Sequence, residues 1–181
     1  LEGLAKHNGP LDPGRDAAVA KVAARLGHWQ PLELDRWASG EAQAAALADG
    51  IAYVSHDIDD GLRAGLIGIG DLDGVALVGA AAAAARGKGF DEGDGRFVYQ
   101  TARRMITTLI RRSAEESGRR LAALAPAGPE AIRAAGHGVV GFDTATEAEL
   151  AALKAFLFAR VYRHPRVNRI MAGAEQVVAD L

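Results

Sequence analysis

Apolar residues recur three and four positions apart through the stretch from Ser39 to Ala64. On a helix of 3.6 residues per turn they share one face, and they are Leu47, Ile51, Val54, Ile58 and Leu62. Ser39 is a good N-cap, and Glu41 places an acid in the first turn, where the helix dipole favours negative charge. The sequence therefore predicts one long helix with a buried face, which must pack against further elements.

The same period continues along the rest of the chain and predicts an all-α fold. Asn8-Gly9-Pro10 ends the first helix, and Pro165 ends the long helix that Thr146 caps. The run from His137 to Phe142 is the one stretch that could be extended. Further helices are expected over 1–7, 16–26, 75–85, 96–124 and 147–164 and from Val167 onward, with Val98, Ala102, Met105 and Leu109 as the apolar side of 96–124.

Composition excludes several classes of protein. The chain has 181 residues, of which 49% are hydrophobic and 24% charged, as in a globular domain of one core. A net charge of -2 gives no general attraction to nucleic acid or anionic membrane, and the absence of cysteine excludes disulfides and thiolate chemistry. The most apolar run, 75–85, is too short to cross a bilayer. We expect a cytoplasmic protein with no membrane and no stable nucleic-acid partner.

A second stripe on the long helix is polar. Asp49, Tyr53, Asp57 and Asp60 stand at i, i+4, i+8 and i+11, so they share one face. Acids at helical spacing usually form a solvated surface, and that is one interpretation. The alternative is a binding site, because the other exposed faces of this chain use Arg, Glu, Gln and Ala rather than acids around a tyrosine.

Three separated motifs carry a resemblance to a known family. The segment DGIAY at 49–53, continuing to DIDD at 57–60, resembles the ADDIxY…D…D motif of the deoxynucleoside triphosphate triphosphohydrolases, the dGTPase family of the HD superfamily. The opening LEGLAKHNGP resembles the segment that follows the HD motifs in shorter bacterial members, and LKAFLFARVYRHPRV resembles their C-terminal region. The resemblance spans essentially the whole chain.

The resemblance implies a fold and a domain organisation. Residues 1–181 would form a single helical domain, the C-terminal portion of an HD-domain-type helical bundle. The chain begins at Leu1, without Met, in what reads as the middle of a helix. We therefore expect a C-terminal fragment of a longer HD-domain protein, and the family likeness suggests a homo-oligomer.

The resemblance also implies roles for the polar stripe. Asp49 would be a ligand of a catalytic divalent metal, and an oxygen ligand beside imidazoles suits Mg²⁺ or Mn²⁺. Tyr53 would lie against the deoxyribose of a dNTP, and Asp57 would accept a hydrogen bond from the sugar 3′-hydroxyl. Asp60 is expected at the end of the site or in a structural role.

His56-Asp57 looks like the dipeptide that names the HD superfamily, but we do not expect it to bind metal. The other histidines, His7, His28, His137 and His164, are scattered, and none has an acid beside it. The family's first histidine and its His-Asp pair would lie upstream of Leu1. One expected ligand of four is therefore present, and the isolated chain should bind metal poorly and be inactive.

Basic residues are candidates for phosphate contacts. Lys6 and His7 belong to a motif that in relatives faces the triphosphate, and we favour Lys6. Arg103 lies on the second long helix with Arg96, Tyr99 and Gln100, where a nucleotide pocket and surface salt bridges are both possible. For Arg160, Arg163, His164 and Arg166, a phosphate or effector site and an oligomer contact stay open. The glycine-rich stretches 65–74 and 87–95 lack the Lys-Ser/Thr of a P-loop and are expected to be connectors.

Gly50 departs from the family pattern, because relatives commonly have a second acid there. Glycine in a helix costs about 1 kcal/mol relative to alanine, so we expect a close neighbour at this position. The function implied is metal-dependent hydrolysis of dNTPs to deoxynucleoside and triphosphate, with a base preference that the sequence does not give. The alternative is a non-catalytic helical module of the same family that binds nucleotide or acts in assembly.

Overall fold

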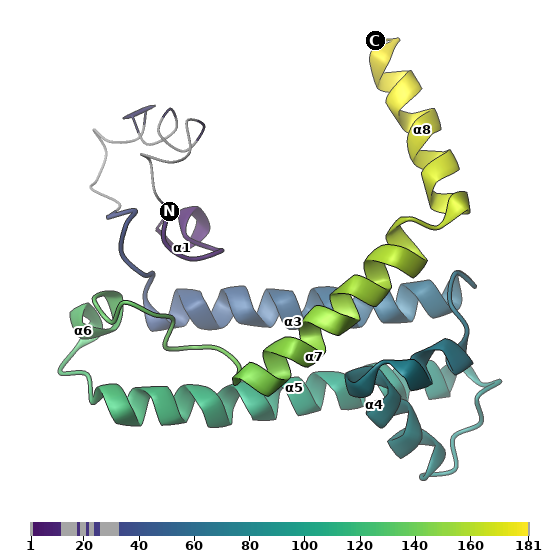
Figure 1. Ribbon diagram of the computed structural model, residues 1–181, viewed down its shortest axis with the longest axis horizontal. Helices are drawn as coiled ribbons and strands as arrows, with labels where there is room; N and C mark the ends of the chain where they lie inside the picture. The colour runs from purple at the N-terminus through teal and green to yellow at the C-terminus, as the bar shows by residue number, and fades with distance from the viewer. Residues whose placement is uncertain (1, 12–17, 19–20, 22–23, 26–32, 181) are drawn as a thin grey trace. The chain divides into compact units, whose positions relative to one another are not determined.

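A computed structural model describes the chain except residues 1, 12–17, 19–20, 22–23, 26–32 and 181. Every regular element in the described part is helical, which confirms the all-α prediction (Figure 1). The elements are α1 (Glu2–Ala5), α3 (Gly40–Arg63), the 3₁₀ turn η1 (Ile69–Gly74), α4 (Ala76–Arg86), α5 (Gly95–Leu124), α6 (Pro129–Arg133), α7 (Thr144–Leu157), the π-helical turn η2 (Phe158–Tyr162) and α8 (Pro165–Ala179). Most of the helix expected over 16–26 lies outside the described residues.

The chain divides into two compact units. The first contains Leu1–Gly50 and Arg111–Asp143, and the second contains Ile51–Ile110 and Thr144–Leu181. Helices α3 and α5 therefore each contribute one part to each unit. No helix of the described residues is long and apolar enough to cross a membrane.

The start of α3 follows the capping prediction. The backbone N–H of Ala42 donates to the Ser39 hydroxyl at 3.3 Å, and Glu41 lies in the first turn. The apolar stripe of α3 enters the second unit, where Ile51, Val54 and Ile58 are buried. The helix ends at Arg63, one residue before the predicted boundary.

Packing in the second unit corrects the buried face predicted for the first half of α5. The buried residues of its first half are Phe97, Thr101, Met105 and Leu109, whereas Val98 and Ala102 are only half-buried. Phe97 is the larger apolar side chain, so its complete burial removes more apolar surface from water than burial of Val98 would. Leu153 and Leu157 of α7 are also fully buried, and α4 packs against η1 and α7.

In the first unit, side chains replace strand pairing along the segment that could be extended. The backbone N–H of Val139 donates to Gln43 Oε1 at 2.8 Å, and that of Gly141 donates to Ser117 Oγ at 3.1 Å. Arg120 donates to the carbonyls of Gly138 and Phe142. The segment forms no strand because its polar backbone groups are bound by these side chains.

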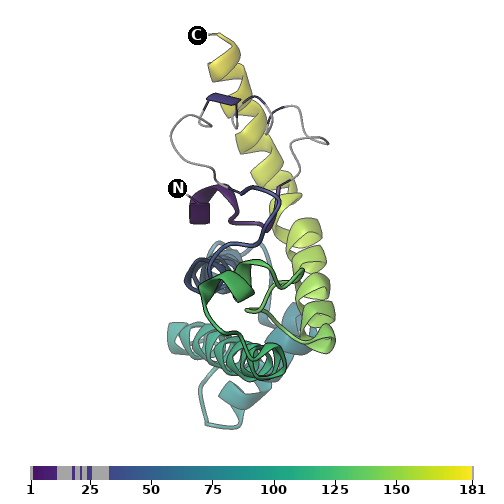
Figure 2. The same cartoon turned by 90° about the vertical axis from the view of Figure 1, so that its left-hand side faces the viewer.

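Both C-terminal helices begin earlier in the chain than expected, and a π turn separates α7 from the break at Pro165. α7 begins at Thr144, so Thr146, predicted as the cap, is a buried residue of its first turn. After η2, the backbone N–H of Arg166 donates to His164 Nδ1 at 3.2 Å, which caps α8 at Pro165. Within the second unit, α8 extends away from α7, and none of its side chains is buried (Figure 2).

Candidate functional site

The polar stripe of α3 lies on the side of the helix that does not enter the core. The side chain of Asp49 is 72% exposed, Tyr53 is 60% exposed, and Asp57 is half-buried. Ile51, Val54 and Ile58 occupy the opposite face. In the second unit, Tyr53 and Asp57 thus lie away from the face of α3 that is fixed by apolar burial.

In the second unit, Asp57 has a partner that the sequence did not reveal. The Tyr162 hydroxyl, on the π turn η2, donates to Asp57 Oδ2. Burial raises the pKa of the Tyr162 phenol, and hydrogen bonds to Asp57 and to Tyr53 raise it further. Tyr162 therefore stays protonated at neutral pH as a donor, and it lies beside both the tyrosine and the second acid of the stripe.

The signal that could have identified Tyr162 is its position in the third motif, RVYRHP. Helical spacing did not single it out, because α7 ends at Leu157 and Tyr162 is the last residue of the π turn that follows. Single π turns inside α-helical stretches are frequent at functional sites, since they shift the direction of the side chains that follow.

In the first unit, Asp49 is accompanied by His7. The distance from His7 Nε2 to Asp49 Oδ2 is 3.5 Å. His7 follows the short helix α1 in a turn closed by a 2.9 Å hydrogen bond from Gly9 N–H to the Lys6 carbonyl. Gly9 has a φ of 103°, a conformation that glycine adopts readily. The HNGP motif therefore places an imidazole against the carboxylate predicted to bind metal.

The described residues by themselves do not complete a metal site. Carboxylate and imidazole are suitable ligands, and Asp49 and His7 supply one of each. In the part of the chain that the structure describes, no group of three or more His, Cys, Asp or Glu side chains is placed to hold an ion. Asp49 as a metal ligand stays a prediction.

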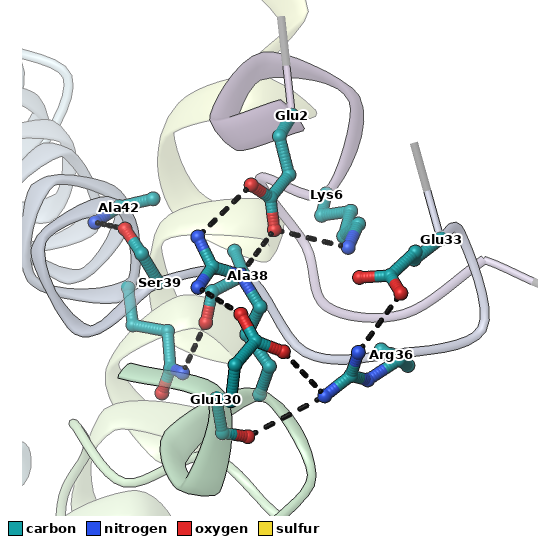
Figure 3. A network of polar contacts seen from close by, with 10 residues as sticks. Glu2, Lys6, Glu33, Arg36, Ala38, Ser39, Ala42 and Glu130 are labelled. Atoms are coloured by element: carbon teal, nitrogen blue, oxygen red, sulfur yellow. Dashed lines mark hydrogen bonds and ion pairs between the residues drawn. The ribbon is translucent and has the colours of Figure 1, made fainter. Parts of the chain in front are cut away.

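Lys6 lies in a polar network of the first unit rather than on its surface (Figure 3). Its side chain is fully buried, and its Nζ atom is 3.2 Å from Glu2 Oε1. Glu2 also accepts from Arg133, and this hydrogen bond is the main cause of its lowered pKa, with Lys6 contributing. In this arrangement Lys6 has a structural partner, and its predicted phosphate contact stays a prediction.

The arginines predicted near the nucleotide differ in their surroundings. Arg103 is exposed on α5, and Arg96 pairs with Asp94 at 2.6 Å. Near the C-terminal break, Arg160 pairs with Asp71 at 2.7 Å, and Arg163 lies over the Phe158 ring at 5.0 Å. Arg160 and Arg163 thus have local partners, and both alternatives predicted for them stay open. The predicted role of Arg103 also remains a prediction.

Two further features of the motif are placed by the structure. His56 is exposed, whereas its neighbour Asp57 turns toward Tyr162, so the two side chains of the dipeptide have different surroundings. At Gly50 no described atom lies within 4 Å of where a Cβ would be. The expectation of a close neighbour there is therefore wrong, and a side chain at this position would project into open space.

Comparison with known proteins finds relatives that carry the same name. The chain is 45% identical over 183 residues to a deoxyguanosinetriphosphate triphosphohydrolase-like protein of Parvibaculum lavamentivorans, and 43% and 38% identical to proteins so named in Mesorhizobium japonicum and Caulobacter vibrioides. Each match covers 100% of this chain and 46% of the relative. A family described as a phosphohydrolase-associated domain matches residues 140–181.

Over its whole length, the chain is similar to the C-terminal part of the deoxyguanosinetriphosphate triphosphohydrolase-like proteins. It spans about half the length of the curated relatives it matches and corresponds to their C-terminal part. In this chain, the segment matched by the phosphohydrolase-associated domain includes Tyr162, the partner of Asp57.

Proposed function

We propose that the full-length protein hydrolyses deoxynucleoside triphosphates, dGTP-like substrates among them, to the deoxynucleoside and triphosphate in a metal-dependent reaction. Water adds to the α-phosphorus, and the bond from that phosphorus to the sugar 5′-oxygen breaks. The names of the relatives support the reaction class. The observation that carries the proposal for this chain is the hydrogen bond from Tyr162 to Asp57 on the polar face of α3.

That hydrogen bond favours sugar recognition over a merely solvated acid. A carboxylate has two oxygens with about four acceptor positions, so one donor from Tyr162 leaves others free for a sugar hydroxyl. Because the pKa of Tyr162 is raised, its phenol keeps donating and holds Asp57 in one orientation. Tyr53, exposed one helical turn earlier, is available to lie against the deoxyribose ring.

The remaining roles follow the family resemblance. Asp49 is proposed as one ligand of Mg²⁺ or Mn²⁺, with the rest of the ligand set outside the described residues. Such an ion supplies positive charge at the phosphoryl group and lowers the pKa of bound water. Lys6 and Arg103 are proposed to neutralise phosphate charge, for which Lys6 would have to leave Glu2. We also propose a cytoplasmic homo-oligomer.

The second candidate is a non-catalytic module that binds nucleotide or acts in assembly. Gly50 favours it, because the second acid of the family motif is missing and no neighbouring residue takes its place within 4 Å in the described structure. The two functions differ in one readout, which is the release of inorganic triphosphate.

The experiment uses the full-length gene product with each dNTP and Mn²⁺, singly and in mixtures that provide possible activators. We expect triphosphate release that Asp49→Ala abolishes while the fold is retained. His56→Ala is the matched control on the same helix and should keep most of the activity. Absence of triphosphate from every mixture would exclude the enzyme, and loss of activity in His56→Ala but not in Asp49→Ala would show that the motif is assigned incorrectly.

A further inference from the structure

Arg104 on α5 is half-buried and has no partner among the described residues. Its Nε atom is shielded from solvent and donates no hydrogen bond there, and no ion pair or ring contact within that part of the chain involves its guanidinium. Buried donors of this kind are rare, because an unpaired polar group loses its water without gaining a replacement. The charge of an arginine raises that cost. These facts indicate an anionic partner that the described residues do not supply.

The other half-buried arginines show what is usual in this chain. Those that pair with a carboxylate at 3.2 Å or less are Arg36, Arg86, Arg120 and Arg133. Arg112, which is also half-buried, has an interaction partner as well. The lack of a partner is therefore particular to the position of Arg104 and is not a general feature of arginines with this burial.

A second polar atom without a partner lies one turn away on α5. Thr101 is completely buried, and its Oγ1 atom has no hydrogen bond within the described residues. Residues three apart on a helix are neighbours on its surface. Unused hydrogen-bonding capacity is thus concentrated at one place on this helix.

The surroundings of Arg104 along α5 favour an anion with several charges. Arg103 is its neighbour in sequence, and residues 96–110 include no Asp or Glu. Gln100 stands one turn before Arg104 on the same flank of the helix and is half-buried too. The opposite flank is apolar and consists of Val98, Ala102 and Ile106. Positive charge and polar donors therefore gather on one side of α5.

A polyphosphate has the chemistry that this side of α5 recognises. A guanidinium presents five N–H donors in a planar fork, which matches two oxygens of a phosphate group. A single carboxylate would leave the second arginine of the pair, Arg103, without a counter-charge. A triphosphate carries enough negative charge for both, and residues 96–110 hold no acid that competes with it.

We propose that Arg104 binds the polyphosphate of a nucleotide, with Gln100 beside it as a further donor. Arg104 belongs to the second unit, as do Tyr53 and Asp57, the residues proposed to bind the sugar. The inference rests on the proposed function, because it takes a nucleotide as the ligand, but it does not depend on hydrolysis. The polyphosphate belongs either to the substrate or to a second, activating nucleotide.

The test is isothermal titration calorimetry of the full-length protein with inorganic triphosphate, which the proposed reaction releases and does not consume. Arg104→Gln should raise the Kd for triphosphate by about tenfold or more, as expected for loss of a hydrogen-bonded charge. Arg104→Lys keeps the charge but not the fork and should retain part of the affinity. Arg169→Gln is the matched control, because it removes the same charge from an exposed position on α8, and it should change the Kd by less than about twofold.

A second ligand separates phosphate binding from folding. Deoxyguanosine has no phosphate, so its Kd should be the same in the wild type and in Arg104→Gln. An unchanged Kd for triphosphate in Arg104→Gln would overturn the proposal, and so would an equal loss of affinity for triphosphate and deoxyguanosine. Triphosphate binding that depends on Arg104, in a protein that hydrolyses no dNTP, would support this site and exclude the proposed reaction.

Steady-state kinetics with mixtures of dNTPs distinguish the two sources of the polyphosphate. A higher KM for Arg104→Gln at saturating activator assigns the polyphosphate to the substrate. A higher activator concentration at half-maximal rate, with an unchanged KM, assigns it to the second nucleotide.

Discussion

The Tyr162 hydroxyl donates a hydrogen bond to the Asp57 carboxylate, although the two residues are 105 positions apart in the chain. Asp57 belongs to α3 and Tyr162 to the π turn after α7, and both lie in the second compact unit. This hydrogen bond joins the C-terminal motif, which contains Tyr162, to the acidic motif, which contains Asp57. It supports a shared role for the two motifs in substrate recognition.

Replacing Tyr162 by phenylalanine tests this shared role. The variant keeps the ring but removes the donor that orients Asp57, so we expect kcat/KM for dNTPs to fall about tenfold, a loss of roughly 1.4 kcal/mol, mainly through KM. Tyr99→Phe is the matched control, because Tyr99 is exposed on α5. An equal loss in both variants would contradict the assignment.

The raised pKa of Tyr162 predicts a change of stability at alkaline pH. The folded state favours the protonated phenol, so its contribution is complete below the unfolded value of about 10 and is lost as pH rises above it. Urea unfolding of the wild type and of Tyr162→Phe at several pH values measures the difference. The stability advantage of the wild type should shrink above about pH 10; an advantage independent of pH would show that the two states do not differ in this pKa.

The ion pair of Glu2 with Lys6 predicts that Glu2→Ala destabilises the first unit. The Lys6 ammonium is fully buried, and Arg133 would also lose its contact with Glu2. We expect a loss of about 2 kcal/mol in the free energy of unfolding, measured with urea at neutral pH. Glu33→Ala is the control, because the Glu33–Arg36 pair is exposed and should contribute less than about 1 kcal/mol.

The same pair has a pH dependence of opposite sign to that of Tyr162. The pKa of Glu2 is lowered in the folded state, chiefly by Arg133. Its contribution is therefore present above the unfolded value of about 4.3 and is lost as pH falls through the lower folded value. Between neutral pH and acid, the difference between wild type and Glu2→Ala should decrease. A difference that stays constant would mean that the carboxylate charge is not what stabilises Lys6.

Gln43→Ala tests how the segment 138–142 is held. Gln43 Oε1 accepts from the backbone N–H groups of Val139 and Val140, and its Nε2 donates to the Ala38 carbonyl at 2.8 Å. The variant leaves these groups without their partner and should cost about 2–3 kcal/mol in unfolding free energy. Hydrogen exchange at Val139 should become faster. Unchanged exchange would show that the amide is protected by other means.

The helical architecture was predictable because α3, α4 and α5 have strong periodic patterns and clear ends. Ser39 caps α3 as its position suggests. The predicted face of α5 was displaced at its start, because Phe97 and Thr101 lie one residue before Val98 and Ala102 and only packing decides which set is buried. The short helix α6 was missed, since its five residues carry too little periodicity.

The candidate site was predictable only in part. The spacing of Asp49, Tyr53 and Asp57 on one face follows from helix geometry, and the structure reproduces it. The contacts to Tyr162 and His7 depend on tertiary folding and on local turns that spacing does not encode. The surroundings of Lys6 were not predictable either. A basic residue in a motif does not show whether a carboxylate such as Glu2 already neutralises it.

The central claim is that the polar face of α3 recognises the sugar of a deoxynucleoside triphosphate. Its most direct test measures triphosphate release by the full-length protein from a dNTP and from the matching 2′,3′-dideoxynucleoside triphosphate, in the wild type and in Asp57→Ala. We predict that the wild type prefers the dNTP by about tenfold or more, as expected for one hydrogen bond to a charged group, and that Asp57→Ala processes both at the same low rate. A preference for the dNTP that persists in Asp57→Ala would contradict the account.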